Sequence, residues 1–128
     1  MKNESIHIDT RSNLNTAVLL ITFNRLDTTK KVFESIRKAK VPRLYIASDA
    51  PRAKVQGEEE LVKSVREYLM LNIDWPCEVK TCFHKKNLGC KLGCTGAIDW
   101  FFEHEEMGII LEDDCLPSQS FFWYCEEL

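Results

Sequence analysis

The chain alternates short apolar runs with longer segments in which apolar residues recur at helical spacing. The apolar runs predict strands over residues 17–23, 44–48 and 107–111, and alternation of apolar and polar residues predicts another over residues 77–83. The periodic segments predict helices over residues 28–40, 58–69, 90–104 and 118–128. Strict alternation of strand and helix is typical of an α/β fold, here a three-layer sandwich around a mostly parallel sheet.

Individual residues refine these elements. The run over residues 17–23 is apolar without interruption and partly β-branched, which fits a strand buried on both faces. Asp27 is expected to cap the following helix and Pro42 to end it. For the helix over residues 90–104, the residues expected on or near the inner side are Leu92, Gly96, Ile98, Phe101 and Phe102.

The length of 128 residues corresponds to one small domain. Residues 1–16 are polar without a sustained period, so we expect an N-terminal arm followed by one α/β domain over residues 17–128. Because an aromatic-rich segment at residues 121–124 lies close to the last residue, we expect this domain to be truncated at its C-terminus.

Composition and charge exclude several classes of protein. Hydrophobic residues make up 45% and charged residues 29% of the chain, which is typical of a folded globular domain. The net charge of −3 argues against a nucleic-acid-binding protein, which should carry a basic surplus. The sequence also contains no apolar run near the ~20 residues that a membrane-spanning helix needs.

The six cysteines all lie in the second half of the chain, at positions Cys77, Cys82, Cys90, Cys94, Cys115 and Cys125. Their spacing does not provide the two tight pairs of a common zinc site. No secretory signal precedes them, so a disulfide-rich secreted protein is disfavoured. We therefore expect free thiols packed as small apolar side chains, in a reducing compartment such as the cytoplasm.

Polar and charged residues follow every predicted strand. Ligands of open α/β sheets bind beyond the carboxyl ends of the strands, so these segments are the first candidates for a site. They comprise residues 22–25, 48–52, 84–89 and 112–114.

The acidic segment of Glu112, Asp113 and Asp114 gives the strongest chemical signal. Three consecutive carboxylates repel one another unless a cation or a hydrogen-bond donor neutralises them. If the strand extends through this segment, alternation places Glu112 and Asp114 on one side and Asp113 on the other. Carboxylate oxygens suit Mg²⁺ or Mn²⁺. A solvated acidic turn or a helix cap is the alternative, but the position at a strand exit favours a metal site.

The glycines argue against two nucleotide-binding classes. Gly89, Gly93 and Gly96 match neither the dinucleotide-binding pattern nor the P-loop. Backbone N–H groups at the start of the helix near Gly89 could meet an anion. For Gly93 and Gly96 we favour close packing of the helix on the sheet. No serine elbow is present, and His7, His84 and His104 have no context that marks them as catalytic.

The order of these motifs resembles the nucleotide-diphospho-sugar transferase superfamily, which has the GT-A glycosyltransferase fold. The resemblance rests on residues 17–25, the pair Ser48-Asp49, the loop Asn87-Leu88-Gly89 and residues 111–114. The Glu-Asp-Asp segment resembles the acidic motif of N-acetylglucosaminyltransferase I-like enzymes. The similarity covers nearly all of the chain from residue 17 onward and implies a Rossmann-like nucleotide-binding half of a GT-A domain.

The resemblance implies roles for individual residues. The residues implied to contact the nucleotide base and ribose are Thr22, Phe23, Asn24 and Arg25. Asp49 is implied to hydrogen-bond the base, commonly uracil. Asn87, Gly89 and Lys91 are implied to lie near the diphosphate or the donor sugar, with Lys91 the weaker candidate.

The acidic motif is implied to hold the metal. Asp113 is directed to the ribose or the donor sugar, Asp114 coordinates Mn²⁺ or Mg²⁺, and Glu112 supports it. The ion bridges the two phosphates and neutralises the charge of the departing nucleoside diphosphate.

The expected function is therefore donor binding in a metal-dependent glycosyltransferase. It would use a nucleoside-diphosphate sugar, preferably a UDP-sugar, and an unidentified sugar, lipid or protein acceptor. The sequence offers no residue for acceptor activation. One alternative is a non-catalytic binding or assembly module, which could self-associate through an exposed sheet edge. A sugar-nucleotide nucleotidyltransferase is a weaker alternative, because residues 24–27 lack a glycine-rich loop.

Overall fold

The computed structural model describes residues 15–114 of the chain. Its elements are β1 (Ala17–Thr22), α2 (Leu26–Ala39), β2 (Arg43–Ser48), α3 (Glu58–Leu71), β3 (Glu78–Phe83), α4 (Cys90–Phe102) and β4 (Gly108–Glu112). Residues 1–14 of the expected arm, the expected helix over residues 118–128, Cys115 and Cys125 lie outside the described part.

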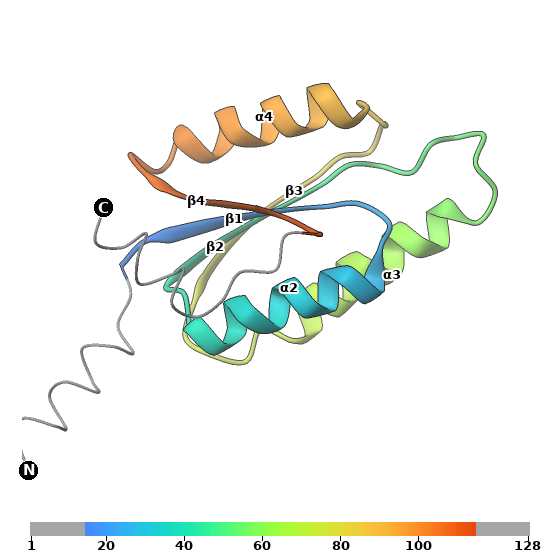
Figure 1. Cartoon of the computed structure of the whole chain (residues 1–128). Helices are drawn as coiled ribbons and strands as arrows, with labels where there is room; N and C mark the ends of the chain where they lie inside the picture. Colours follow the sequence, from blue (N-terminus) through green and yellow to red (C-terminus); the bar gives the residue numbers. More distant parts are fainter. Residues whose placement is uncertain (1–14, 115–128) are drawn as a thin grey trace, which may run out of the picture.

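The four described strands form one parallel sheet in the order β3-β2-β1-β4. Helix α4 covers one face, whereas α2 and α3 cover the other, so the sheet is the middle of three layers (Figure 1). The α/β sandwich expected from the sequence is therefore confirmed, and its sheet is small and Rossmann-like. Parallel strands need long crossovers, which the intervening helices provide here.

The two central strands explain why the sheet is stable. Strand β1 is almost completely buried, and β2 is buried from Leu44 to Ser48. Alternate residues of each strand enter separate apolar clusters, so that Leu20 packs on the side of α2 and α3 while Leu19 packs on the side of α4. An uninterrupted apolar run is what a strand covered on both faces requires.

Helix α2 begins earlier than the sequence predicts. Arg25, not Asp27, occupies its N-cap position, and Asp27 lies in the first turn. The Asp27 carboxylate still accepts a hydrogen bond from the backbone N–H of Thr28 at 2.9 Å. The helix ends at Ala39, because Lys40 adopts a left-handed conformation with φ of 51° before Pro42 is reached.

Helix α4 covers its face of the sheet with few side chains. Ala97 and Phe101 are buried against β1 and β2, in agreement with the prediction for Phe101. Leu92 and Phe102 were also expected inside, but their exposed fractions are 63% and 42%. The prediction was wrong for these two residues because the buried line of α4 runs through Ala97 and Phe101, and Leu92 and Phe102 each lie about 140° around the helix from Ala97.

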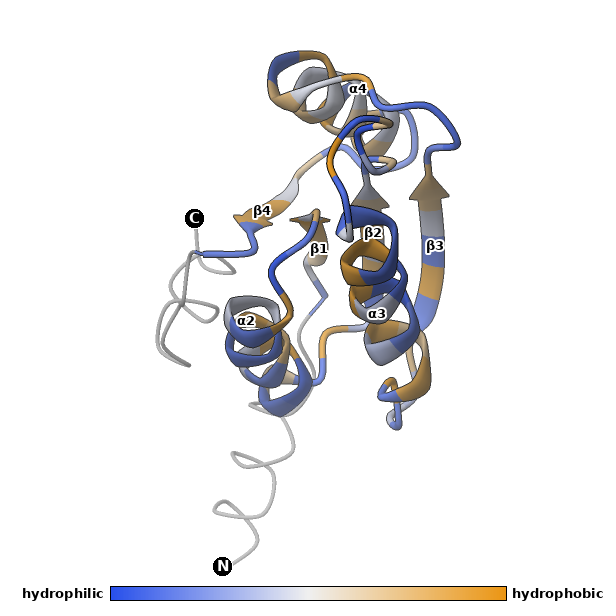
Figure 2. Cartoon of the chain, turned by 90° about the vertical axis from the view of Figure 1, so that its right-hand side faces the viewer, coloured by the Kyte–Doolittle hydropathy of each residue, from blue (hydrophilic) through white to orange (hydrophobic). Residues whose placement is uncertain are grey.

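Because the four strands are parallel, the segments that follow them all leave the sheet at the same end, where the carboxyl ends of the strands lie. Figure 2 views the molecule from this end and shows that the segments leaving β1, β2 and β3 are mostly hydrophilic. Strands β3 and β4 are the edges of the described sheet. None of the helices within residues 15–114 combines the length and apolar character needed to span a bilayer.

Candidate functional site

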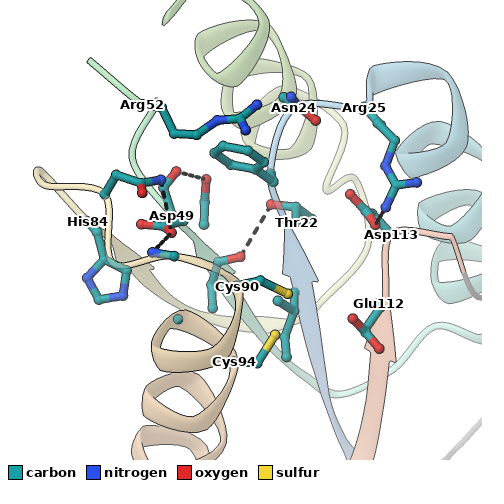
Figure 3. A pocket seen from close by; sticks show the side chains of 17 residues that line it. Thr22, Asn24, Arg25, Asp49, Arg52, His84, Cys90, Cys94, Glu112 and Asp113 are labelled. Atoms are coloured by element: carbon teal, nitrogen blue, oxygen red, sulfur yellow. Dashed lines mark hydrogen bonds and ion pairs between the residues drawn. The ribbon is translucent and has the colours of Figure 1, made fainter. Parts of the chain in front are cut away.

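A cavity of about 380 Å³ lies where β1, β2 and β4 end, beside the first turns of α4 (Figure 3). Its volume is within the range of small-molecule sites, about 300–1,000 Å³. The predicted site residues that line it are Thr22, Phe23, Asn24, Arg25, Asp49, Asn87, Gly89, Glu112 and Asp113. Residues from four separate segments of the sequence thus meet in one cavity.

Two predicted site residues do not line the cavity. Lys91 is exposed in the first turn of α4. Asp114 follows β4 and is also exposed, and its Oδ2 atom lies 3.7 Å from Nη2 of Arg25. Their neighbours in the sequence do line the cavity, namely Cys90 next to Lys91 and Asp113 next to Asp114.

The acidic segment lies beside the first strand, because β4 pairs with β1 and Glu112 is the register partner of Ile21. Glu112 and Asp114 are exposed, whereas Asp113 is only 5% exposed. Because β4 ends at Glu112, Asp113 and Asp114 lie in a turn, and the strand alternation expected for them does not apply. Both Glu112 and Asp113 line the cavity.

The structure places a cation of the protein itself beside these acids. Nη2 of Arg25 donates a hydrogen bond to Oδ1 of Asp113 at 3.1 Å. Burial nevertheless raises the pKa of the Asp113 carboxyl above its usual value. Arg25 opposes this rise, and the nearby charges of Asp114 and Glu112 add to it.

The donor set at this edge suits a hard divalent ion only in combination with a ligand. Within residues 15–114, no group of three or more His, Cys, Asp or Glu side chains is arranged to hold a metal ion. Glu112 and Asp113 provide carboxylate oxygens on the cavity wall. Mg²⁺ commonly takes one or two carboxylates and completes its shell with water and substrate phosphates, so these residues fit such an ion.

Asp49 holds the opposite wall together. Its Oδ1 atom accepts hydrogen bonds from the backbone N–H groups of Ala50 and Leu88 at 2.8 and 2.9 Å. Its Oδ2 atom accepts from the N–H of Gly89 at 3.0 Å and from the side-chain amide of Asn87 at 3.2 Å. The carboxylate therefore ties the loop before α4 to the end of β2.

The glycines of α4 contribute unequally to this wall. Gly89 precedes the helix with φ of 88°, a conformation that disfavours other residues. A Cβ at Gly93 would lie 3.5 Å from Oδ2 of Asp49, which is ordinary contact. A Cβ at Gly96 would meet nothing within 4 Å, so the expected close packing is wrong for Gly96.

Glu58 is the most deeply buried charged residue near the site, with an exposed fraction of 1%. It accepts hydrogen bonds from Nε of Arg52 at 2.9 Å, from Nη2 of Arg52 at 2.6 Å and from the backbone N–H of Arg52 at 2.8 Å. The side-chain amide of Asn24 donates a further bond at 3.0 Å. The Arg52 hydrogen bonds are the main cause that lowers the pKa of Glu58 to about 2.

Arg66 of α3 supports the same wall from behind. Its Nη2 atom donates to the backbone carbonyls of Ser48, Asp49 and His84 at 3.0–3.1 Å. Its Nε atom donates to Oγ of Ser48 at 2.9 Å. One guanidinium thus joins the ends of β2 and β3, and burial lowers its pKa.

Several residues of the site escaped the sequence analysis. Glu58 was not among the predicted site residues. Arg66 was not singled out at all. The cavity is also lined by Ser48, Arg52, His84, Cys90 and Cys94. Most of these residues lie in or next to the strand-exit segments, and that was the available signal.

The four cysteines within the described part are free thiols, but the expected packing as small apolar side chains is wrong for Cys90, which is exposed, and the other three are only partly buried. Cys90 and Cys94 lie one helical turn apart on the cavity wall (Figure 3). Burial, with a contribution from Cys90, raises the pKa of Cys94 to about 11. The neutral thiol form is therefore favoured at Cys94.

Comparisons with known proteins add no relative. No protein-family model, no curated protein and no solved structure matches this chain.

Proposed function

We propose that this chain is the donor-binding part of a metal-dependent glycosyltransferase. It would bind a nucleoside-diphosphate sugar, preferably a UDP-sugar, and pass the sugar to a sugar, lipid or protein acceptor. The observation that carries the proposal is the shared cavity. Glu112 and Asp113 at the end of β4 face the same space as the exits of β1 and β2.

The distribution of charges on the cavity wall supports one orientation of the bound nucleotide. Carboxylates of Glu112 and Asp113 gather at the β4 side, whereas Arg52 and His84 lie at the β2 and β3 side (Figure 3). A diphosphate accompanied by a divalent cation suits the β4 side, since the cation offsets like charges. The base then extends toward Phe23 and Arg52.

Glu112 and Asp113 are the residues that would hold the metal, with Asp114 next to them at the outer side of the turn. A bound Mn²⁺ or Mg²⁺ supplies positive charge against the departing nucleoside diphosphate. Arg25 contributes a second positive charge at the same place, because it is 3.1 Å from Asp113.

One observation favours a second candidate function. Arg25 already pairs with Asp113 and approaches Asp114, so the acids have a counter-charge without a metal. A non-catalytic nucleotide-binding or assembly module would need no more than this. The unpaired edges of β3 and β4 in the described sheet could then serve self-association.

Titration calorimetry with UDP, in the presence and absence of Mn²⁺, separates the two functions. We expect Mn²⁺ to strengthen UDP binding by at least tenfold, which corresponds to about 1.4 kcal/mol. Glu112→Gln and Asp114→Ala should each reduce this enhancement while the circular dichroism spectrum stays unchanged. Glu106→Gln is the matched control, because Glu106 is exposed and precedes β4 outside the cavity.

The outcomes are distinct. UDP binding that is equal with and without Mn²⁺ would support the metal-free module. Absence of UDP binding under both conditions would contradict both nucleotide-binding functions.

A further inference from the structure

The side chain of Arg52 is held in one orientation at the cavity wall. Two of its guanidinium nitrogens, Nε and Nη2, bind the two oxygens of Glu58 in a bidentate pair. Its guanidinium carbon lies 5.8 Å from the centroid of the Phe23 ring. A planar guanidinium with two fixed nitrogens cannot rotate freely, so its remaining edge points in a defined direction.

The remaining edge of Arg52 is available to a ligand. Within residues 15–114, the Nη1 atom has no hydrogen-bond partner. Arg52 lines the cavity although Glu58, which holds it, is buried. Because Glu58 already orders the Arg52 side chain, a ligand need not supply the conformational entropy of ordering it. Such preorganisation favours selective recognition.

Asp49 is poorly suited to receive the base directly. A carboxylate offers about four lone-pair sites, and four donors already occupy those of Asp49. A base N–H could bind there only by displacing a hydrogen bond that fixes the loop before α4. The role that the family resemblance implies for Asp49 therefore conflicts with its contacts.

We propose that Arg52 selects the base, and that Glu58 is the positioning residue that makes this selection possible. Nη1 of Arg52 would donate to the keto oxygen O4 of uracil or O6 of guanine. Cytosine and adenine present an amino donor at the corresponding place, and arginine has no acceptor to pair with it. This inference rests on the proposed nucleotide-binding function and narrows its ligands to uridine and guanosine diphosphates.

The contact with Phe23 agrees with this assignment. Phe23 lines the cavity beside Arg52, and a base can stack on an aromatic ring whatever its identity. Stacking on Phe23 supplies affinity for every base, whereas the Nη1 donor of Arg52 discriminates among them.

The test compares UDP, GDP, CDP and ADP by titration calorimetry with Mn²⁺ present. The wild-type chain should bind UDP and GDP about tenfold more tightly than CDP and ADP, which corresponds to about 1.4 kcal/mol. Arg52→Met combined with Glu58→Gln should bring this ratio to about 1. The second substitution removes the buried charge that Arg52→Met alone would leave without its partner.

Two further variants complete the test. Glu58→Gln alone should lower the ratio about threefold, because it loosens Arg52 without removing it. This base preference is a property that a purely structural role of Glu58 would leave unchanged. Lys54→Met is the matched control for loss of a cation from the same loop, and it should keep the full ratio, because Lys54 does not line the cavity.

Three results would overturn the inference. The first is equal binding of all four diphosphates by the wild type, which leaves the proposed function intact. The second is a ratio that survives in the double variant while all four affinities stay unchanged, which would show that Arg52 does not contact the ligand. The third is an equal weakening of all four ligands by the double variant, which would assign Arg52 to phosphate. Failure of every diphosphate to bind the wild type would overturn the proposed function as well.

Discussion

The two sides of the cavity differ in how their charges are satisfied. At the β2 side, which we call the β2 wall (Asp49, Arg52, Glu58 and Arg66), each charged group has several hydrogen bonds within the protein. At the β4 side lie the β4 acids (Glu112, Asp113 and Asp114), of which Asp113 and Asp114 share the single cation Arg25 within the described residues. The β2 wall is therefore preformed, whereas the β4 acids gain most from a bound cation.

The two sides therefore have different roles in binding a ligand. Polar groups whose hydrogen bonds are satisfied within the protein set the shape of a site. Groups held close to like charges, as Asp113 is to Glu112 and Asp114, have unfavourable electrostatics that a ligand can relieve.

The largest expected effect comes from breaking the β2 wall at its centre. Asp49→Ala removes the acceptor of three backbone N–H groups and of the Asn87 amide. We expect the free energy of unfolding to fall by about 3 kcal/mol, since each unsatisfied group costs about 1–3 kcal/mol and water replaces part of the loss. Urea denaturation followed by circular dichroism measures the change.

Asp99→Ala serves as the control for Asp49→Ala, because Asp99 is exposed on α4 and its side chain makes no hydrogen bond within residues 15–114. A loss of less than about 0.5 kcal/mol at Asp49, the range of ordinary surface substitutions, would show that the wall does not depend on this carboxylate.

A smaller loss is expected at Arg66. Arg66→Met keeps much of the apolar stem but leaves the carbonyls of Ser48, Asp49 and His84 without this donor. We expect a loss of about 2 kcal/mol, in line with hydrogen bonds to a charged group of about 1.5–3 kcal/mol. Hydrogen exchange should also show faster opening of the segment at residues 84–89. Unchanged exchange there would contradict the bracing role.

Acid should weaken the β2 wall through Glu58. Its pKa in the folded chain is lowered to about 2 from the usual value of 4.5, so its contribution to stability is complete above about pH 4.5. That contribution is lost as the pH falls from 4.5 toward 2. Denaturation curves at pH 6, 4 and 2.5 should therefore show a steeper loss for the wild type than for Glu58→Gln. Parallel curves for the two proteins would refute this linkage.

The smallest effect on stability is expected among the β4 acids. Burial raises the pKa of Asp113, so its charged form costs stability at neutral pH and Asp113→Asn should change the free energy of unfolding by less than about 1 kcal/mol. The same variant should weaken the Mn²⁺-dependent part of UDP binding. A large destabilisation without an effect on UDP binding would contradict the conclusion that the β4 acids serve ligand binding rather than stability.

The sequence predicts the fold of this protein better than it predicts the hydrogen bonds and ion pairs of the site. Apolar runs located β1, β2 and β4, and the runs of β1 and β2 are apolar because both faces of these strands are buried. Strand β3 is partly exposed and was located by its alternation of apolar and polar residues. The carboxyl ends of parallel strands lie at the same end of a sheet, which correctly predicted that Asn24, Asn87 and Asp113 lie near one another around one cavity.

The partners of polar side chains could not be predicted in this way. Glu58 binds Asn24, which is 34 residues away, and Arg25 binds Asp113, which is 88 residues away. Hydrophobic periodicity shows which side of a helix is buried, but it assigns no partner to a charged residue on that side. For the same reason, Arg66 looked like an ordinary helix residue, although it joins the ends of β2 and β3.

Paramagnetic broadening by Mn²⁺ in amide NMR spectra tests the central claim most directly. Trace Mn²⁺ together with UDP should broaden the amide signals of residues 21–25 and 112–114, and Mn²⁺ without UDP should broaden them much less. This result would locate a cation and a diphosphate jointly between β1 and β4. Broadening confined to other acidic surfaces, such as Glu59 and Glu60 of α3, or no change on addition of UDP, would contradict the account.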